Sequence, residues 1–343
     1  MQLIRVVSFT QKGERLAEKI AYEGECFKVD HKLPGEDTRE FLKESFAMAV
    51  PVVFIGACGI AVRLIAPLVR DKFIDSAVVV IDEKGKYVIP ILSGHIGGAN
   101  KLAKELAGIT RGEAVLTTST DVNELFAADL FAKYNGLRIY NRDGIKAVSS
   151  KIIDKGLIEM SLSPDIGFNS YEVPEGIAIK AYPPEKPVDI IVSFDEGDRD
   201  MCSLLLIPKE YTVGIGCRKG ISAETIEKQL DKCLNLAGLN TYCGEVAVIA
   251  SIDLKVAEYG LLKCAAKKGL RLKTYPEERL REIEGDFTKS EFVKDITGVD
   301  NVCERAAVCA AGKSGELILK KQAENGVTVA IAKRIVRIKR WKE

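Results

Sequence analysis

Apolar and polar positions alternate in blocks along the first 135 residues. Short apolar runs without internal alternation, such as Val52–Ile55, are typical of strands that are buried on both faces. Between these runs lie segments with helical patterns, such as residues 14–22. Buried strands joined by helices predict a three-layer α/β/α domain with a mainly parallel sheet. The predicted strands are 2–9, 26–29, 52–55, 77–81, 87–92 and 114–116, and residues 82–85 give a hairpin signal. The predicted helices are 14–22, 39–47 with Thr38 as its N-cap, a helix that follows Gly59 and runs through Val69, 101–107 and 123–134.

The pattern changes after about Gly136, where strands dominate and the links are rich in turns. Residues 157–162, 176–182, 188–194 and 203–208 predict strands, and the proline-rich stretch 183–187 excludes a helix there. From Tyr211, strands 212–215, 246–251, 270–274 and 327–332 are separated by helices, the first of them capped by Ser222. We therefore predict an N-terminal α/β domain (1–135), a small α+β middle module (136–210) and a C-terminal α/β domain (211–343).

Charge and hydropathy narrow the class of protein. The 343 residues include 50 basic and 49 acidic side chains, a net charge of +1, which argues against a globally basic nucleic-acid binder and a strongly acidic disordered chain. The uncharged run 46–62 contains Pro51, Gly56 and Gly59, so we interpret it as strand, turn and helix and expect no membrane span. The first ten residues lack the apolar core of a secretory signal.

Cysteine and histidine usage bears on metals and on the compartment. The nine cysteines include no Cys-x-x-Cys pair, and the chain has only two histidines. These features argue against a structural zinc site and a disulfide framework. We expect reduced cysteines, a cytoplasmic protein and no metal of its own.

The first candidate motif is the glycine-rich sequence SGHIGGAN at 93–100, after a strand and before a helix. Glycines allow a sharp turn and close approach of a ligand, and free amides at a helix start attract anions. His95 can exchange protons near neutral pH, although a histidine in a turn can equally well cap a helix or bond a carbonyl. The motif matches neither the dinucleotide or P-loop patterns nor the serine nucleophile elbow.

Two further clusters follow predicted strands of the first domain. GACG at 56–59 precedes Arg63 by one helical turn, and TTSTD at 117–121 supplies hydroxyls and a carboxylate whose default role is to cap a helix. Ligands of open parallel sheets bind beyond the carboxyl ends of the strands. We therefore predict that the Gly56 turn, the Ser93 turn and the Thr117 cluster line one crevice.

A further motif, GIGCRKG at 214–220, combines glycines with Arg218 and Lys219 at a helix start. This combination suits a carboxylate or a phosphate, and the alternative is a tight turn with solvated cations. The basic C-terminal residues 333–342 contain one aromatic residue, Trp341, and we interpret them as a solvated strand end rather than a nucleic-acid arm.

These loops resemble the cobalamin-biosynthesis CbiG family of cobalt-precorrin-5A hydrolases. The resemblance extends in family order over nearly the whole chain and is weakest in the middle module. It is carried by the stretches FIGACGIAVR (54–63), VIPILSGHIGGAN (88–100), TTSTD (117–121), VGIGCRKG (213–220), and VCERAA (302–307) with Ala311-Gly312.

The resemblance implies an activity in the anaerobic corrin pathway. The substrate would be a cobalt-bearing tetrapyrrole with many carboxylates and a ring δ-lactone; water opens the lactone, and a two-carbon unit leaves as acetaldehyde. Cobalt would arrive with the substrate, so no separate cofactor is expected. Other corrin-pathway enzymes are conceivable partners, nucleic acid is not expected, and the sequence leaves the oligomeric state open, a homodimer included.

On this basis His95 is the candidate base, with Asp121 as a second group. Arg63, Arg218 and Lys219 are candidate carboxylate clamps, and backbone amides near Gly97 and Gly98 are candidate donors to the oxyanion. The other expected substrate contacts are Gly56, Cys58, Gly59, Ser93, Asn100, Thr118, Ser119, Gly216 and Cys217. Two rival functions remain: a corrinoid-binding scaffold without chemistry, and a nucleotide-binding regulator.

Overall fold

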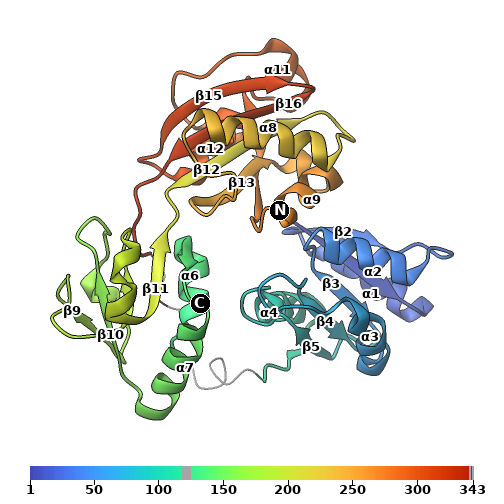
Figure 1. The fold of residues 1–343 in the computed structure, drawn as a ribbon. Helices are drawn as coiled ribbons and strands as arrows, with labels where there is room; N and C mark the ends of the chain where they lie inside the picture. Colours follow the sequence, from blue (N-terminus) through green and yellow to red (C-terminus); the bar gives the residue numbers. More distant parts are fainter. Residues whose placement is uncertain (118–124, 340, 342–343) are drawn as a thin grey trace. The chain divides into compact units, whose positions relative to one another are not determined.

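The computed structural model describes residues 1–117, 125–339 and 341. Figure 1 shows the helices and strands of the chain with their labels. The described chain divides into two compact units. The first contains Met1–Leu116, Thr212–Cys243 and Val248–Lys333, and the second is built around residues 125–211. The described chain forms three sheets, so the predicted mixed α/β class is confirmed. The three domain ranges stay a prediction.

The first sheet holds its strands in the order β2-β1-β3-β4-β5-β6. Strands β1 to β4 are parallel, β5 runs antiparallel to β4, and β6 runs parallel to β5. The predicted hairpin at residues 82–85 is therefore confirmed, and it reverses the chain direction in the sheet. The bounds are β1 Gln2–Ser8, β2 Phe27–His31, β3 Val52–Ile55, β4 Val78–Ile81, β5 Tyr87–Leu92 and β6 Glu113–Ala114.

Helices cover both faces of this sheet, as predicted. One apolar cluster joins Ile4 and Val6 of β1 to helices α1 (Gln11–Glu23) and α4 (Ala99–Thr110). A second cluster, on the other face, joins Val52 and Phe54 of β3 to α2 (Thr38–Ala47) and α3 (Cys58–Ile65). Alternate side chains of each strand thus enter opposite layers, because the side-chain period of a strand is two residues.

The N-cap of α2 differs from the prediction. Asp37 is the capping residue, and its carboxylate accepts hydrogen bonds from the N–H groups of Arg39 and Glu40. Thr38 is already the first helical residue. A carboxylate is the stronger partner for the free amides at a helix start, because the helix dipole also favours negative charge there.

The second unit contains a five-stranded sheet in the order β7-β11-β10-β8-β9. Strands β8 to β11 are parallel and β7 is antiparallel to β11, so this sheet is more parallel than the predicted α+β module implies. The residue pattern did not predict β7 or α7. The predicted helix 123–134 corresponds to α6, whose described part begins at Ala128. The bounds are α6 Ala128–Asn135, β7 Leu137–Ile139, α7 Asp143–Lys155, β8 Ile158–Leu162, β9 Ile177–Lys180, β10 Val188–Val192 and β11 Cys202–Pro208.

The third sheet belongs to the first unit and has the order β14-β13-β12-β16-β15. Strands β13 and β14 are parallel, and β15 pairs antiparallel with β16. A Cβ at Gly214 of β12 would collide with the Cys303 carbonyl oxygen, so this glycine allows α12 to pack directly on the sheet. The bounds are β12 Tyr211–Cys217, α8 Ala223–Leu236, β13 Val246–Ile252, α9 Tyr259–Lys267, β14 Leu272–Tyr275, α10 Glu277–Arg281, α11 Glu291–Thr297, α12 Val302–Ala311, β15 Glu316–Glu324 and β16 Val327–Lys333.

Candidate active site

The Ser93–Gly98 turn closes directly onto the start of α4. The carbonyl oxygens of Ser93 and Gly94 accept hydrogen bonds from the N–H groups of Ala99 and Asn100, each at 3.1 Å. Two of the amides at the helix start are therefore already bonded and are not available to an anion. The remaining candidate oxyanion donors in the turn are the amides near Gly97 and Gly98.

Two glycines make this compact turn possible. A Cβ at Gly97 would collide with Ser93 Cβ, and a Cβ at Gly94 would lie 2.7 Å from Asn100 Oδ1. The glycines of the motif therefore let the turn fold against its own side chains. Asn100 is buried at the base of the turn, so its proposed contact with substrate competes with a structural role.

His95 lies in the middle of this turn and is half-buried. It also interacts with neighbouring groups of the protein. A residue in this position is neither sealed in the core nor fully solvated. The placement therefore leaves His95 able to meet a ligand.

Thr117 follows β6, which pairs with β5 in the parallel direction. The ends of these two strands lie at the same edge of the sheet, the edge that carries the Ser93 turn. The predicted site residues Thr118, Ser119 and Asp121 lie outside the described residues.

The Gly56 turn lies at the opposite edge, and the prediction of one crevice for the three loops is wrong. The Gly56 N–H donates to the carbonyl of Ile81, the last residue of β4, whereas Leu92 at the end of β5 pairs with Val78, the first residue of β4. Because β5 is antiparallel, its carboxyl end meets the amino ends of the parallel strands. Val78 and Ile81 are three residues apart, or about 10 Å along a strand.

This correction separates Gly56, Cys58 and Gly59 from His95, but it affects Arg63 less. Helix α3 leads from the carboxyl end of β3 back toward the amino end of β4. Arg63 is five residues beyond Cys58, about 7.5 Å along the helix axis. It is exposed and lies nearer to the Ser93 edge than Cys58 does.

A polar pair that the residue pattern did not reveal lies at the Gly56 edge. Ser8 Oγ and His31 Nε2 are 2.9 Å apart and stand at the ends of β1 and β2. The available signal was that each residue lies at the end of a strand and that the two strands pair in parallel. A serine and a histidine at this distance have the geometry of a nucleophile and its base.

The GIGCRKG motif spans the end of β12 and the loop after it. Arg218 and Lys219 are both exposed, as the clamp hypothesis requires. The Gly220 N–H donates to Glu258 Oε1 at 2.8 Å. This amide is therefore already hydrogen-bonded to a carboxylate of the protein and is not available to a substrate anion. Burial raises the pKa of the Cys217 thiol to about 11, which keeps it neutral at physiological pH and makes it a poor nucleophile.

Within the first unit, polar and apolar contacts join the first sheet to the third sheet. Thr274 Oγ1 at the end of β14 donates to the carbonyl oxygen of Met1, which precedes β1, at 3.3 Å. This contact lies at the amino end of β1, and another, from Tyr259 Oη to Asp30 Oδ2 at 2.8 Å, lies near the carboxyl end of β2. An apolar cluster continues this contact and contains Leu3, Met48, Val50, Val256 and Leu262.

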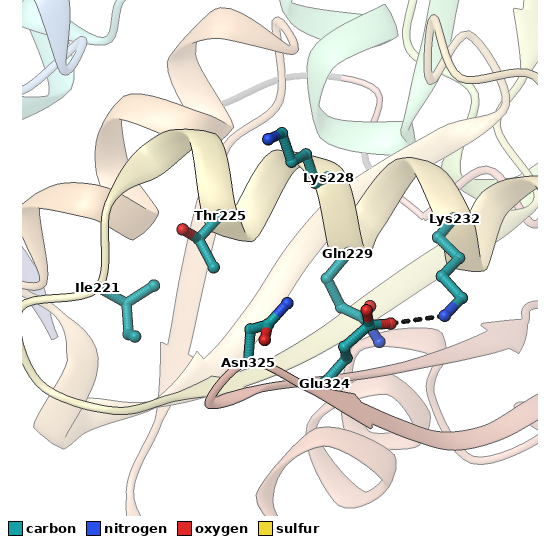
Figure 2. Close-up of a pocket in the computed structure, with 7 residues that line it drawn as sticks. All are labelled: Ile221, Thr225, Lys228, Gln229, Lys232, Glu324 and Asn325. Carbon is teal, nitrogen blue, oxygen red and sulfur yellow. Dashed lines mark hydrogen bonds and ion pairs between the residues drawn. The ribbon is translucent and has the colours of Figure 1, made fainter.

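A separate hollow of about 440 Å³ lies between α8 and the β15–β16 hairpin (Figure 2). Lys232 forms an ion pair with Glu324 at one end, and Lys228 points away from that pair. None of the described residues that were predicted to bind substrate lines this hollow. The lining residues are Ile221, Thr225, Lys228, Gln229, Lys232, Glu324 and Asn325.

The described residues offer neither a metal centre nor a membrane span. Within residues 1–117, 125–339 and 341, no three His, Cys, Asp or Glu side chains gather closely enough to hold a metal ion. None of the described helices combines the length and the apolar character needed to cross a membrane.

Comparison with known proteins identifies the family. The model of the cobalamin synthesis G N-terminal region matches residues 40–121, and that of the cobalamin synthesis G C-terminus matches residues 211–332. A cobalt-precorrin-5A hydrolase of Salmonella typhimurium is 34% identical over an alignment of 307 residues, which covers 84% of this chain and 83% of that protein. The chain belongs to the cobalamin synthesis G family. Both matched regions contain loops described above: the Ser93 turn in the first and the Arg218 loop in the second.

Other members of the cobalamin synthesis G family are similar over comparable lengths. A cobalt-precorrin-5A hydrolase of Priestia megaterium is 33% identical and covers 85% of this chain and 79% of its own. The crystal structure of a cobalamin biosynthesis protein G homologue from Sulfolobus solfataricus is 24% identical, covers 97% of each chain and superposes with a TM-score of 0.41.

Proposed function

We propose that this protein is a cobalt-precorrin-5A hydrolase, which opens the ring δ-lactone and releases acetaldehyde to give cobalt-precorrin-5B. The observation that carries this proposal is the identity of about a third to hydrolases of that name over more than four fifths of the chain. The loops that resemble the family are also the loops that the two family models match.

We assign lactone opening to the Ser93 edge of the first sheet. His95 takes a proton from water, the water oxygen adds to the lactone carbonyl, and the ring oxygen leaves with a proton as a secondary alcohol. Amides near Gly97 and Gly98 stabilise the oxyanion. The same base, or Asp121, then deprotonates the alcohol, and the carbon–carbon bond breaks to release acetaldehyde while the macrocycle accepts the electron pair.

Binding of the substrate is assigned to cations and glycine loops. The exposed guanidinium and ammonium groups of Arg218 and Lys219, together with Arg63, suit the many carboxylates of a corrin precursor. Contacts between the first and third sheets, which belong to one compact unit, support a substrate site that draws on both.

We further propose that the enzyme carries no cofactor and that cobalt belongs to the substrate. Burial raises the pKa of Cys217 and Cys233 to about 11 and that of Cys264 to about 12, which disfavours the thiolate form that metals bind. We also propose that the protein is located in the cytoplasm, that it contacts other corrin-pathway enzymes and that it forms a homodimer.

The test is anaerobic incubation of the full chain with cobalt-precorrin-5A and measurement of acetaldehyde. Release of acetaldehyde in proportion to the substrate consumed is the expected result. Binding of the corrinoid without acetaldehyde would instead identify a scaffold. Stabilisation by nucleotides but not by carboxylated corrinoids in a thermal-shift panel would indicate the nucleotide-binding alternative.

A further inference from the structure

Ser93 combines two unfavourable features at the start of the candidate catalytic turn. Its Oγ atom is shielded from solvent and has no hydrogen-bond partner among the described residues. Its backbone φ is +55°, in the left-handed region that residues other than glycine rarely adopt. In the part of the chain that the structure describes, no other residue shows both features.

Each feature destabilises the free protein. A buried hydroxyl without a partner has lost its bonds to water without replacement, and a left-handed residue with a Cβ is sterically strained. Such costs are most often found at functional sites, where a ligand completes the missing interaction.

The surrounding turn holds Ser93 in this state. Its carbonyl oxygen accepts the Ala99 N–H at 3.1 Å, and the space beside its Cβ is open only because residue 97 is glycine. The backbone therefore cannot relax without breaking the start of α4. Because the residue is half-buried while its Oγ is shielded, the hydroxyl faces the inside of the turn.

We propose that the Ser93 hydroxyl is a catalytic group whose hydrogen bond is completed by the substrate. On binding, the side chain turns outward and its O–H donates to the carbonyl oxygen of the δ-lactone, which becomes the oxyanion when water adds. This inference rests on the proposed hydrolase function. The lactone oxygen gains negative charge as water adds, so the bond from the Ser93 hydroxyl becomes stronger in the transition state than in the bound ground state, and such a difference accelerates the reaction.

A pair of serine-to-alanine substitutions tests the free state. Ser93→Ala removes an unpartnered hydroxyl, so we expect the melting temperature to rise by roughly 1–4 °C. Ser45→Ala is the matched control, because Ser45 is fully buried and its Oγ donates to the Phe41 carbonyl at 2.7 Å and accepts from Arg5 at 3.1 Å. This control should lower the melting temperature. A decrease for Ser93→Ala would overturn the proposal.

Kinetics test the role in the reaction. We expect Ser93→Ala and Ser93→Gly to lower kcat/KM by roughly 10- to 100-fold, mainly through kcat, because both lack the hydroxyl. If the backbone geometry alone mattered, both variants would keep their activity, because alanine can keep the conformation of serine and glycine adopts a positive φ readily. Activity of Ser93→Ala within twofold of the wild type would overturn the inference and leave the hydrolase function intact.

The same assay separates this inference from the function on which it rests. If the wild type releases no acetaldehyde, the proposed function fails. The hydroxyl is then tested by the dissociation constant of cobalt-precorrin-5A, and equal affinity of wild type and Ser93→Ala would overturn its role in binding as well.

Discussion

At the level of single residues, the two histidines lie at opposite edges of the first sheet and in different surroundings. His95 lies half-buried in the turn before α4, and His31 is bonded to Ser8 at the other edge of the same sheet. Each imidazole has a ring nitrogen that can accept a proton, and only the loop around it decides what it can reach. The family motif surrounds His95, which is why we assign the chemistry there.

We predict that His95→Gln lowers the turnover of cobalt-precorrin-5A by roughly 10²–10⁴-fold, because glutamine cannot accept the proton of the attacking water. Steady-state acetaldehyde release measures the effect. His31→Gln is the matched control and should keep kcat/KM close to that of the wild type. The reverse result, an inactive His31→Gln and an active His95→Gln, would move the reaction to the Ser8–His31 pair.

Among the secondary-structure elements, the helix starts show how one residue controls a local structure. Asn301 caps α12, and its side-chain Oδ1 accepts the Glu304 N–H at 2.8 Å. Asp37 caps α2 in the same way. Each cap supplies an acceptor for backbone N–H groups that have no partner inside their helix, so each helix begins at a defined residue.

The carboxylate of Glu304, three residues after the Asn301 cap, is fully buried and ties three segments together. It accepts hydrogen bonds from the Thr288 N–H at 2.7 Å, from Asn301 Nδ2 at 2.8 Å and from the Lys321 N–H at 2.7 Å. A buried charge is tolerated when several donors surround it in this way. The VCERAA stretch therefore has a structural function beside the third sheet.

We predict that Glu304→Ala lowers the free energy of unfolding by about 3–5 kcal/mol, because it leaves buried N–H groups without an acceptor. Denaturant unfolding measures the change. Glu282→Ala is the control, since Glu282 pairs with Arg279 on the surface and an exposed ion pair contributes about 0–1 kcal/mol. Equal effects of the two substitutions would contradict the role assigned to Glu304.

The turn before α4 depends on Gly97, and replacing this residue tests whether the shape of the turn matters. Gly97→Ala should reduce both stability and acetaldehyde release, because the new Cβ would collide with Ser93 Cβ. Gly108→Ala in α4 is the control: nothing lies within 4 Å of its Cβ position, so it should stabilise the protein by about 1 kcal/mol. An active and stable Gly97→Ala variant would show that the turn does not need its present shape.

In the molecule as a whole, contacts inside the first unit join segments that are far apart in the sequence. Tyr259 Oη donates to Asp30 Oδ2 at 2.8 Å, and Asp30 also accepts from the buried Arg5 at 2.9 Å. Burial, followed by the hydrogen bond to Asp30, raises the pKa of Tyr259 to about 12. This cluster and the apolar contacts of Leu3 join the first and third sheets.

Because the substrate is proposed to contact both sheets, we predict that Arg218→Ala and Lys219→Ala raise KM more than they lower kcat. Their cations would bind carboxylates equally in the ground state and the transition state. Initial rates over a range of cobalt-precorrin-5A concentrations measure the two constants. Lys228→Ala, at the hollow beside α8, is the control and should change neither. Unchanged KM in both loop variants would remove the loop from the substrate site.

The residue pattern was sufficient for most of the strands and for the α/β class. Apolar runs such as Val52–Ile55 are buried on both faces whatever their neighbours are, so their local sequence is informative. It was not sufficient for β15, whose residues Glu316–Glu324 are largely polar because the strand lies at the edge of its sheet. It also missed α7 in the second unit.

Neighbouring residues in the chain were enough to specify the family, the glycine turns and the candidate base. The arrangement of the loops required the folded molecule, because the antiparallel β5 carries Ser93 away from Gly56, although each loop follows a strand. The unpartnered Ser93 hydroxyl and the buried Glu304 also became visible only there. Strand direction and hydrogen-bond partners are set by contacts between distant segments, and no local pattern records such contacts.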